Sequence, residues 1–151
     1  MIMAQHHTVQ KTIIVRSKPE GLLQKEWIMD AAGLPGMLVE LASSTRIQVC
    51  SGTLAPQFKV ICESGSVPTS GTYASGDQMP FVIPQRGDEV MVYGTSAALA
   101  TIAVGNVVFS EGNGFVSQGT AIAGTSGLGI ALETATIAAD PGLAQYKIEV
   151  L

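Results

Sequence analysis

From Met37 to the C-terminus, apolar residues come in short runs separated by turn-forming residues. In residues 46–50, Ile47 and Val49 alternate with polar neighbours, which is the period of a strand with one buried face. Short strands at this spacing are typical of barrels and sandwiches. We therefore predict an all-β fold: a small β-barrel or tulip-like domain of short antiparallel strands. The predicted strands lie in residues 37–41, 46–50, 58–63, 79–84, 89–94, 106–110, 114–117, 128–133 and 146–151.

Glycine followed by a short polar residue recurs before these runs, at Gly76-Asp77, Gly87-Asp88 and Gly105-Asn106. Glycine adopts the positive φ angles that a Cβ disfavours, and a short Asp or Asn side chain bonds to nearby backbone. In residues 111–115, Asn113-Gly114 supplies the positive-φ pair of a β-hairpin. We expect all of these to be barrel turns that need no ligand.

Residues 1–34 precede the predicted barrel domain at 35–151, and we expect them to form an N-terminal arm and a connecting segment. The β-branched run at 12–16 predicts a strand without a turn that ties it to a following strand. It could add to the edge of a partner's sheet, or it could be a frayed terminus. The candidate partner-binding residues of the arm are Thr12, Ile13, Ile14, Val15 and Arg16.

Residues 17–32 are compatible with a helix. Ser17 could cap its N-terminus, with Glu20 three positions later, and Pro19 is tolerated in a first turn. Gly21 weakens this pattern, and residues 33–36 would end the helix.

The composition points to subunit contacts. Only 13% of the 151 residues are charged, against about 25% in an average soluble protein, and 46% are apolar. A chain so poor in charge is expected to bury surface on assembly. The net charge of −4, with scattered basic residues, argues against nucleic-acid binding, and no run is long and apolar enough to span a membrane. Cys50 and Cys62 could form a disulfide or be two small buried apolar residues.

No catalytic, cofactor or metal site is expected. The glycine-rich stretch 123–135 resembles a dinucleotide-binding turn, but Gly124 and Gly127 are separated by two residues instead of three. The adjacent histidines, His6 and His7, could weakly hold a metal or lie in a solvated tail. A glycosidase pair among the acidic residues stays open, although solvated acids are the default. These acids are Glu63, Asp88, Glu89, Glu111 and Glu133.

Several motifs occur together in an order that resembles the head decoration (cement) proteins of tailed bacteriophages. The matching stretches are PGMLVELAS (35–43), YASGDQMPFVIPQRGDEVMVYG (73–94), VGNVVFSEGNGFV (104–116), GLGIALETA (127–135) and YKIEVL (146–151). Each motif alone is weakly specific, and their order and spacing carry the resemblance.

The resemblance implies a β-barrel-like domain that binds the outside of the head as a homotrimer at local three-fold positions. There it would contact the major capsid protein and stabilise neighbouring capsid subunits, after assembly in the host cytoplasm. The absence of a signal-peptide pattern is consistent with that compartment. Neither a cofactor nor catalysis is implied.

Two other functions stay open. A receptor- or glycan-binding β-domain on the virion surface would need exposed aromatic residues, and aromatic residues make up only 5% of this chain. A small β-barrel hydrolase would need clustered acids, or a nucleophile with a nearby base.

Overall fold

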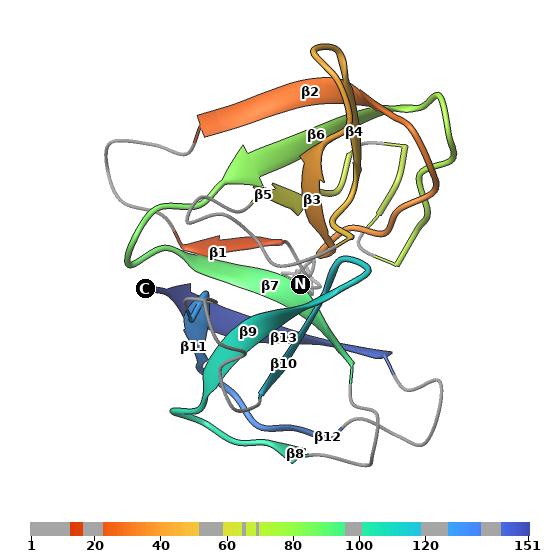
Figure 1. Ribbon diagram of the computed structural model, residues 1–151. Helices are drawn as coiled ribbons and strands as arrows, with labels where there is room; N and C mark the ends of the chain where they lie inside the picture. The colour runs from red at the N-terminus through yellow and green to blue at the C-terminus, as the bar shows by residue number, and fades with distance from the viewer. Residues whose placement is uncertain are drawn as a thin grey trace, which may run out of the picture.

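The residues that the computed structural model describes are 13–16, 23–51, 59–64, 66–68, 70–95, 101–118, 127–136 and 143–151. Across these ranges the chain forms thirteen strands and no helix (Figure 1), and so no helix that could cross a membrane. Each of the nine predicted runs overlaps a strand, which confirms the all-β prediction. The strands are β1 (Ile14–Arg16), β2 (Leu23–Met29), β3 (Leu38–Leu41), β4 (Arg46–Val49), β5 (Lys59–Ile61), β6 (Gln78–Ile83), β7 (Glu89–Thr95), β8 (Thr101–Ile102), β9 (Val107–Gly112), β10 (Phe115–Gln118), β11 (Gly129–Ala131), β12 (Ala135–Thr136) and β13 (Leu143–Val150).

Strands β2 to β6 close into one barrel, called the first barrel, which is the upper one in Figure 1. The order around it is β2-β4-β3-β5-β6. Strand β2 runs parallel to β4 and antiparallel to β6, and the other neighbours are antiparallel. Its core consists mainly of the buried residues Met29, Met37, Val39, Ile47, Ile61, Tyr73, Met79, Phe81 and Ile83.

Strands β7, β9, β10, β11 and β13 close into the second barrel, which is the lower one in Figure 1. The order is β7-β10-β9-β11-β13, and β13 returns to pair with β7. Strand β7 runs parallel to β10, and the other neighbours are antiparallel.

The two barrels have the same topology. In each, the first strand lies parallel to the third and antiparallel to the fifth, while the second pairs with the third and fourth. The match extends to single hydrogen bonds. The Gly36 N–H donates to the Ile61 carbonyl at 2.8 Å, and the Gly105 N–H donates to the Ala131 carbonyl at 2.9 Å. The chain thus builds one fold twice, in tandem.

The predicted turns are confirmed. Gly76, Gly87 and Gly105 have φ angles of +91°, +87° and +87°. In each turn, the Asp or Asn that follows the glycine accepts a hydrogen bond through its side-chain oxygen. The donor is the backbone N–H three residues before that Asp or Asn, and the distances are 2.8, 2.7 and 2.9 Å. The hairpin between β9 and β10 has positive φ at Asn113 and Gly114, as predicted. The third residue of such a four-residue turn has a positive φ angle, which favours glycine at that position.

The barrels meet through a continuous apolar core. Leu38, Cys50, Val60, Cys62 and Val82 come from the first barrel, and they cluster with the interior residues of the second. Strand β6 is therefore buried on both faces from its second residue onward. The two cysteines are buried and form no disulfide, so they are small buried residues of this interface.

The helix expected within residues 17–32 is wrong where the structure describes it, because residues 23–29 form β2. This strand pairs with β6 from Leu23 opposite Ile83 to Ile28 opposite Gln78. Barrel closure supplies hydrogen bonds and burial that outweigh a modest local preference for helix. Strand β2 belongs to the segment predicted to be an arm and connector, so the boundary predicted at residues 34–35 falls inside the first barrel.

Candidate functional site

The predicted arm residues lie against the second barrel where the structure describes them. Strand β1 pairs antiparallel with β7, with Ile14 opposite Val90 and Arg16 opposite Glu89. Figure 1 shows β1 between the two barrels. Thr12 lies outside the described residues. The partner-binding role of this run stays a prediction.

Ile13, just before β1, links the two barrels. Its side chain is fully buried. Its N–H donates to Glu63 Oε2 at 3.1 Å, and its carbonyl accepts a hydrogen bond from the Met91 N–H at 2.8 Å. Glu63 follows β5 of the first barrel, and Met91 lies in β7 of the second. Ile13 is therefore part of the folded unit.

Strand β1 covers backbone that the second barrel would otherwise leave unpaired. Along one edge, β7 pairs with β13 over its whole length. Along the other, called here the outer edge, β10 reaches β7 only at Gly94. The earlier part is covered by β1 and by the Gly36 carbonyl, which accepts a hydrogen bond from the Tyr93 N–H at 3.0 Å.

The first barrel has the same outer edge on β2, where β4 reaches only Ile28 and Met29. Glu26 lies opposite Pro80 of β6. The Pro80 carbonyl accepts a hydrogen bond from the Cys62 N–H at 2.9 Å, so it points away from β2. Opposite residues of two antiparallel strands alternate between pairs that exchange hydrogen bonds and pairs whose N–H and carbonyl groups point away from each other. Glu26 and Pro80 form a pair of the second type. The N–H and carbonyl of Glu26 therefore point to the outer edge.

Glu26 and Met91 hold matched positions. Glu26 lies three residues before Met29, the last residue of β2 that pairs with the parallel strand β4. Met91 lies three residues before Gly94, the residue of β7 that pairs with the parallel strand β10. The Met91 N–H donates to the carbonyl just before β1. Among the described residues, no strand pairs with the outer edge of β2 at Glu26.

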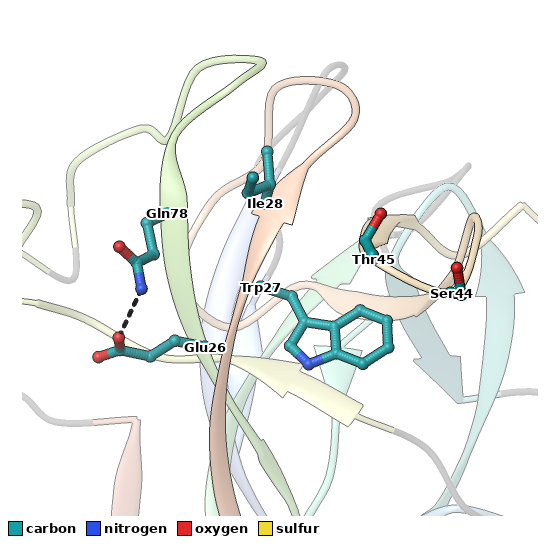
Figure 2. A pocket seen from close by; sticks show the side chains of 6 residues that line it. All are labelled: Glu26, Trp27, Ile28, Ser44, Thr45 and Gln78. Carbon is teal, nitrogen blue, oxygen red and sulfur yellow. Dashed lines mark hydrogen bonds between the residues drawn. The ribbon is translucent and has the colours of Figure 1, made fainter.

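A groove of ≈ 460 Å³ lies at this edge. Figure 2 shows Trp27 extending from β2 toward Ser44 and Thr45, in the turn between β3 and β4. Glu26 and Gln78 point to the other side of β2, where Gln78 Nε2 donates to Glu26 Oε2 at 2.8 Å. The residues that line the groove are Glu26, Trp27, Ile28, Ser44, Thr45 and Gln78.

Trp27 is held in place from the barrel side. Its ring meets that of Phe81 edge to face, with centroids 6.3 Å apart and an interplanar angle of 84°. It packs against the first barrel's core yet stays only partly buried. A large, fixed, partly exposed aromatic side chain beside backbone groups that no described strand pairs with is suited to holding another chain.

The acids singled out in the sequence have structural partners in different places. Asp88 Oδ2 accepts a hydrogen bond from a turn N–H, Glu133 Oε1 accepts one from the Lys147 N–H, and Glu89 pairs with the Lys147 ammonium at 3.9 Å. Glu111 is exposed on β9. Among the described residues no group of three or more His, Cys, Asp or Glu could hold a metal ion.

Two buried ionisable side chains, those of Cys62 and Tyr146, have raised pKa values. Burial, with a smaller contribution from the charge of Glu63, raises the pKa of the Cys62 thiol to about 12. Burial, assisted by Glu111, also raises the pKa of the Tyr146 hydroxyl. Neither group is available as a nucleophile or proton donor near neutral pH, which fits packing roles.

Sequence reasoning did not find the β2 edge, because it placed these residues in a helix. Gly21 and Pro19, both poor in helix interiors, were the signals against that helix. Trp27, the only tryptophan of the chain, was a further signal for a site.

No family model matches the sequence, and no curated protein matches it. Among solved structures, the chain is similar to the N base of the head fiber gp8.5 of bacteriophage phi29. The TM-score is 0.54 at 13% sequence identity, and the match covers 87% of this chain and 95% of that chain. At this identity the likeness shows a shared fold over most of both chains.

Proposed function

We propose that this chain is a structural protein of the surface of a bacteriophage head. The observation that carries the proposal is the fold shared with the phi29 head fiber base, which spans 95% of that chain. The stretches that resemble phage decoration proteins are a second line of support. They include strands of both barrels.

The finer proposal is a decoration or cement role. The chain would bind the exterior of the head as a homotrimer at local three-fold positions and hold neighbouring major capsid subunits together. It would act through binding energy alone, with no catalytic step, cofactor or nucleic acid. Modest contacts repeated by symmetry give an avidity beyond any single contact.

The surface of the second barrel supports subunit contacts. Val104, Val107 and Leu151 are 63%, 39% and 49% exposed. Val107 and Leu151 both lie beside Gly127, where an added Cβ would stand 2.6 Å from the Val107 side chain and 3.3 Å from that of Leu151. Exposed apolar side chains that gather in this way mark interaction surfaces. We assign the patch formed by Val107 and Leu151, which does not include Val104, to the contact between copies.

The test mixes the purified protein with phage heads assembled without it. We expect saturable binding to the head exterior and a higher temperature for release of packaged DNA. Protein that stays in solution at all concentrations would contradict the proposal.

The trimer is tested separately by the mass of the protein in solution and on heads. Val107→Lys should reduce self-association, and the matched control Val104→Lys, also exposed but in the turn before β9, should show how much any added charge does. Wild-type protein that is monomeric both in solution and on heads would contradict the trimer, while leaving head binding intact.

A further inference from the structure

We infer that the outer edge of β2 accepts an extended strand from a protein of the head surface, which completes the first barrel as β1 completes the second. The choice of a head protein as the source rests on the proposed function. The strand-accepting property itself rests on the matched geometry of the two barrels.

The backbone argument comes from the tandem fold. At the outer edge of β7, an antiparallel segment supplies the carbonyl that binds the Met91 N–H at 2.8 Å. The matched Glu26 turns its N–H and carbonyl to the same edge, and no described strand covers them. Strand addition to such an edge gains affinity from main-chain hydrogen bonds and specificity from alternate side chains.

The side chains define the chemistry of the occupant. In the second barrel the residue at this step is Ile13, whose side chain is fully buried. Ile13 lies opposite Met91, the match of Glu26, so the residue of an incoming strand at this step would lie on the Glu26 side of β2. The next residue of that strand would face the groove between Trp27 and the turn at Ser44 and Thr45 (Figure 2). An apolar, β-branched side chain would fill it. On the opposite face, Glu26 favours a basic or amide side chain on the incoming strand.

The same arrangement argues against a sugar as the occupant. Sugar sites combine an aromatic face with polar groups that converge on the same ring. Here Glu26 and Gln78 point to the other side of β2 from Trp27 and are bonded to each other. The groove thus offers a backbone edge and an aromatic wall, which suit a peptide strand.

The first experiment uses a defined peptide, residues 11–18 with blocked ends, because this segment contains the strand that fills the matched edge. It is titrated into the isotope-labelled full-length protein and followed by NMR. We expect shifts of the Glu26 amide and of the Trp27 indole N–H. Unchanged signals at both positions at millimolar peptide, or shifts confined to β7, would overturn the inference.

The matched variants are Glu26→Pro and Glu26→Ala. Proline removes the outward N–H and is tolerated on an edge strand, while the pairing with β6 at this position does not use that N–H. Alanine keeps the N–H. We expect Glu26→Ala to weaken peptide binding about fivefold at most, through the lost carboxylate, and Glu26→Pro to weaken it about tenfold or more beyond Glu26→Ala, through the lost N–H. Both variants must retain the wild-type fluorescence of Trp27 and thermal midpoint, and Gln24→Pro serves as a second blocking variant if Glu26→Pro does not fold.

The same variants are then mixed with undecorated heads. Loss of head binding by Glu26→Pro alone supports the inference. Equal binding by Glu26→Pro and wild type overturns it and leaves the proposed function standing. Wild-type protein that binds the peptide at β2 but no heads overturns the head partner and the proposed function. Self-association that Glu26→Pro abolishes would make a second copy the occupant and overturn the choice of a head protein.

Discussion

The two barrels share one topology and differ at one edge. In the second barrel the outer edge of β7 is covered by β1, which comes from the N-terminal part of the chain. In the first barrel the matched edge of β2 has no described strand beyond Ile28 and borders a groove. Within the described residues, β1 completes one copy of the duplicated fold, while no strand covers the matched edge of the other copy, where we place binding.

The interiors of the barrels differ as well. Matched positions hold Met29 and Met79 in the first barrel but Gly94 and Tyr146 in the second. All four are buried. One barrel fills its core with two flexible side chains of similar size, and the other with one large ring beside a glycine. The same backbone arrangement therefore accepts two packing solutions, each of which depends on both partners.

The largest effect is expected where these solutions are mixed. Gly94→Met places the first barrel's residue in the second, where even a Cβ would collide with the ring of Tyr146. That ring is fully buried among core side chains, so moving it would disturb their packing. We expect the second barrel to lose about 3 kcal/mol or more of unfolding free energy. Urea denaturation followed by far-ultraviolet circular dichroism measures the loss.

Trp27 fluorescence reports the first barrel in the same samples. The double variant Gly94→Met/Tyr146→Met copies the pair of the first barrel and should regain part of the lost stability. A single variant with the wild-type urea midpoint would show that the two cores are not packed as described.

The next effect compares the filled edge with the open one. Ile13→Ala removes a fully buried side chain and should cost about 2–5 kcal/mol of unfolding free energy. Ile28→Ala, next to the part of the β2 edge that no described strand covers, removes a side chain that is 41% exposed and should cost less than about 1 kcal/mol. Equal losses in urea denaturation would mean that β1 is not integrated in the second barrel.

A smaller difference in stability is expected between variants of two similar turns, those that contain Asp77 and Asp88. Asp88 is 2% exposed and Asp77 is exposed, and each accepts a hydrogen bond from the N–H three residues earlier. Removing the buried acceptor leaves a donor without a partner, so Asp88→Ala should cost about 2 kcal/mol and Asp77→Ala about 0.5 kcal/mol. Thermal denaturation of the two variants gives the comparison, and the reverse order would refute it.

The smallest effect concerns two buried tyrosines. The Tyr73 hydroxyl donates to the Cys62 carbonyl at 2.9 Å. In the described part of the chain, the Tyr146 hydroxyl has no hydrogen-bond partner. Tyr73→Phe should therefore cost about 1 kcal/mol, and Tyr146→Phe should cost less or increase stability. A larger loss for Tyr146→Phe in urea denaturation would contradict this.

The strands and turns of the fold could be predicted because they are written in local patterns. The Gly-Asp steps and the Asn113-Gly114 hairpin carry their own conformational preference. A further turn escaped notice because Met37 stands where Asp or Asn stands in the others, and its sulfur accepts the Leu34 N–H at 3.2 Å. The repeat of the fold is hidden for the same reason, since matched positions hold chemically different residues.

The edges could not be predicted, because they depend on tertiary pairing. The sequence predicts a strand at residues 12–16, but whether it pairs with its own chain or with another is decided by the unpaired edge of β7. Likewise β2 has a weak local pattern and becomes a strand through β6, so the Trp27 groove had no local signature beyond the tryptophan itself.

Amide hydrogen exchange at Glu26 and Met91 in the isolated protein tests the central comparison most directly. The two amides hold matched positions, and only that of Met91 donates to a described carbonyl. We expect the Met91 amide to exchange about a hundredfold or more slowly than the Glu26 amide, since a hydrogen-bonded amide exchanges only when the structure opens. Equal protection of the two amides would show that the edge of β2 is already covered, and would contradict the account.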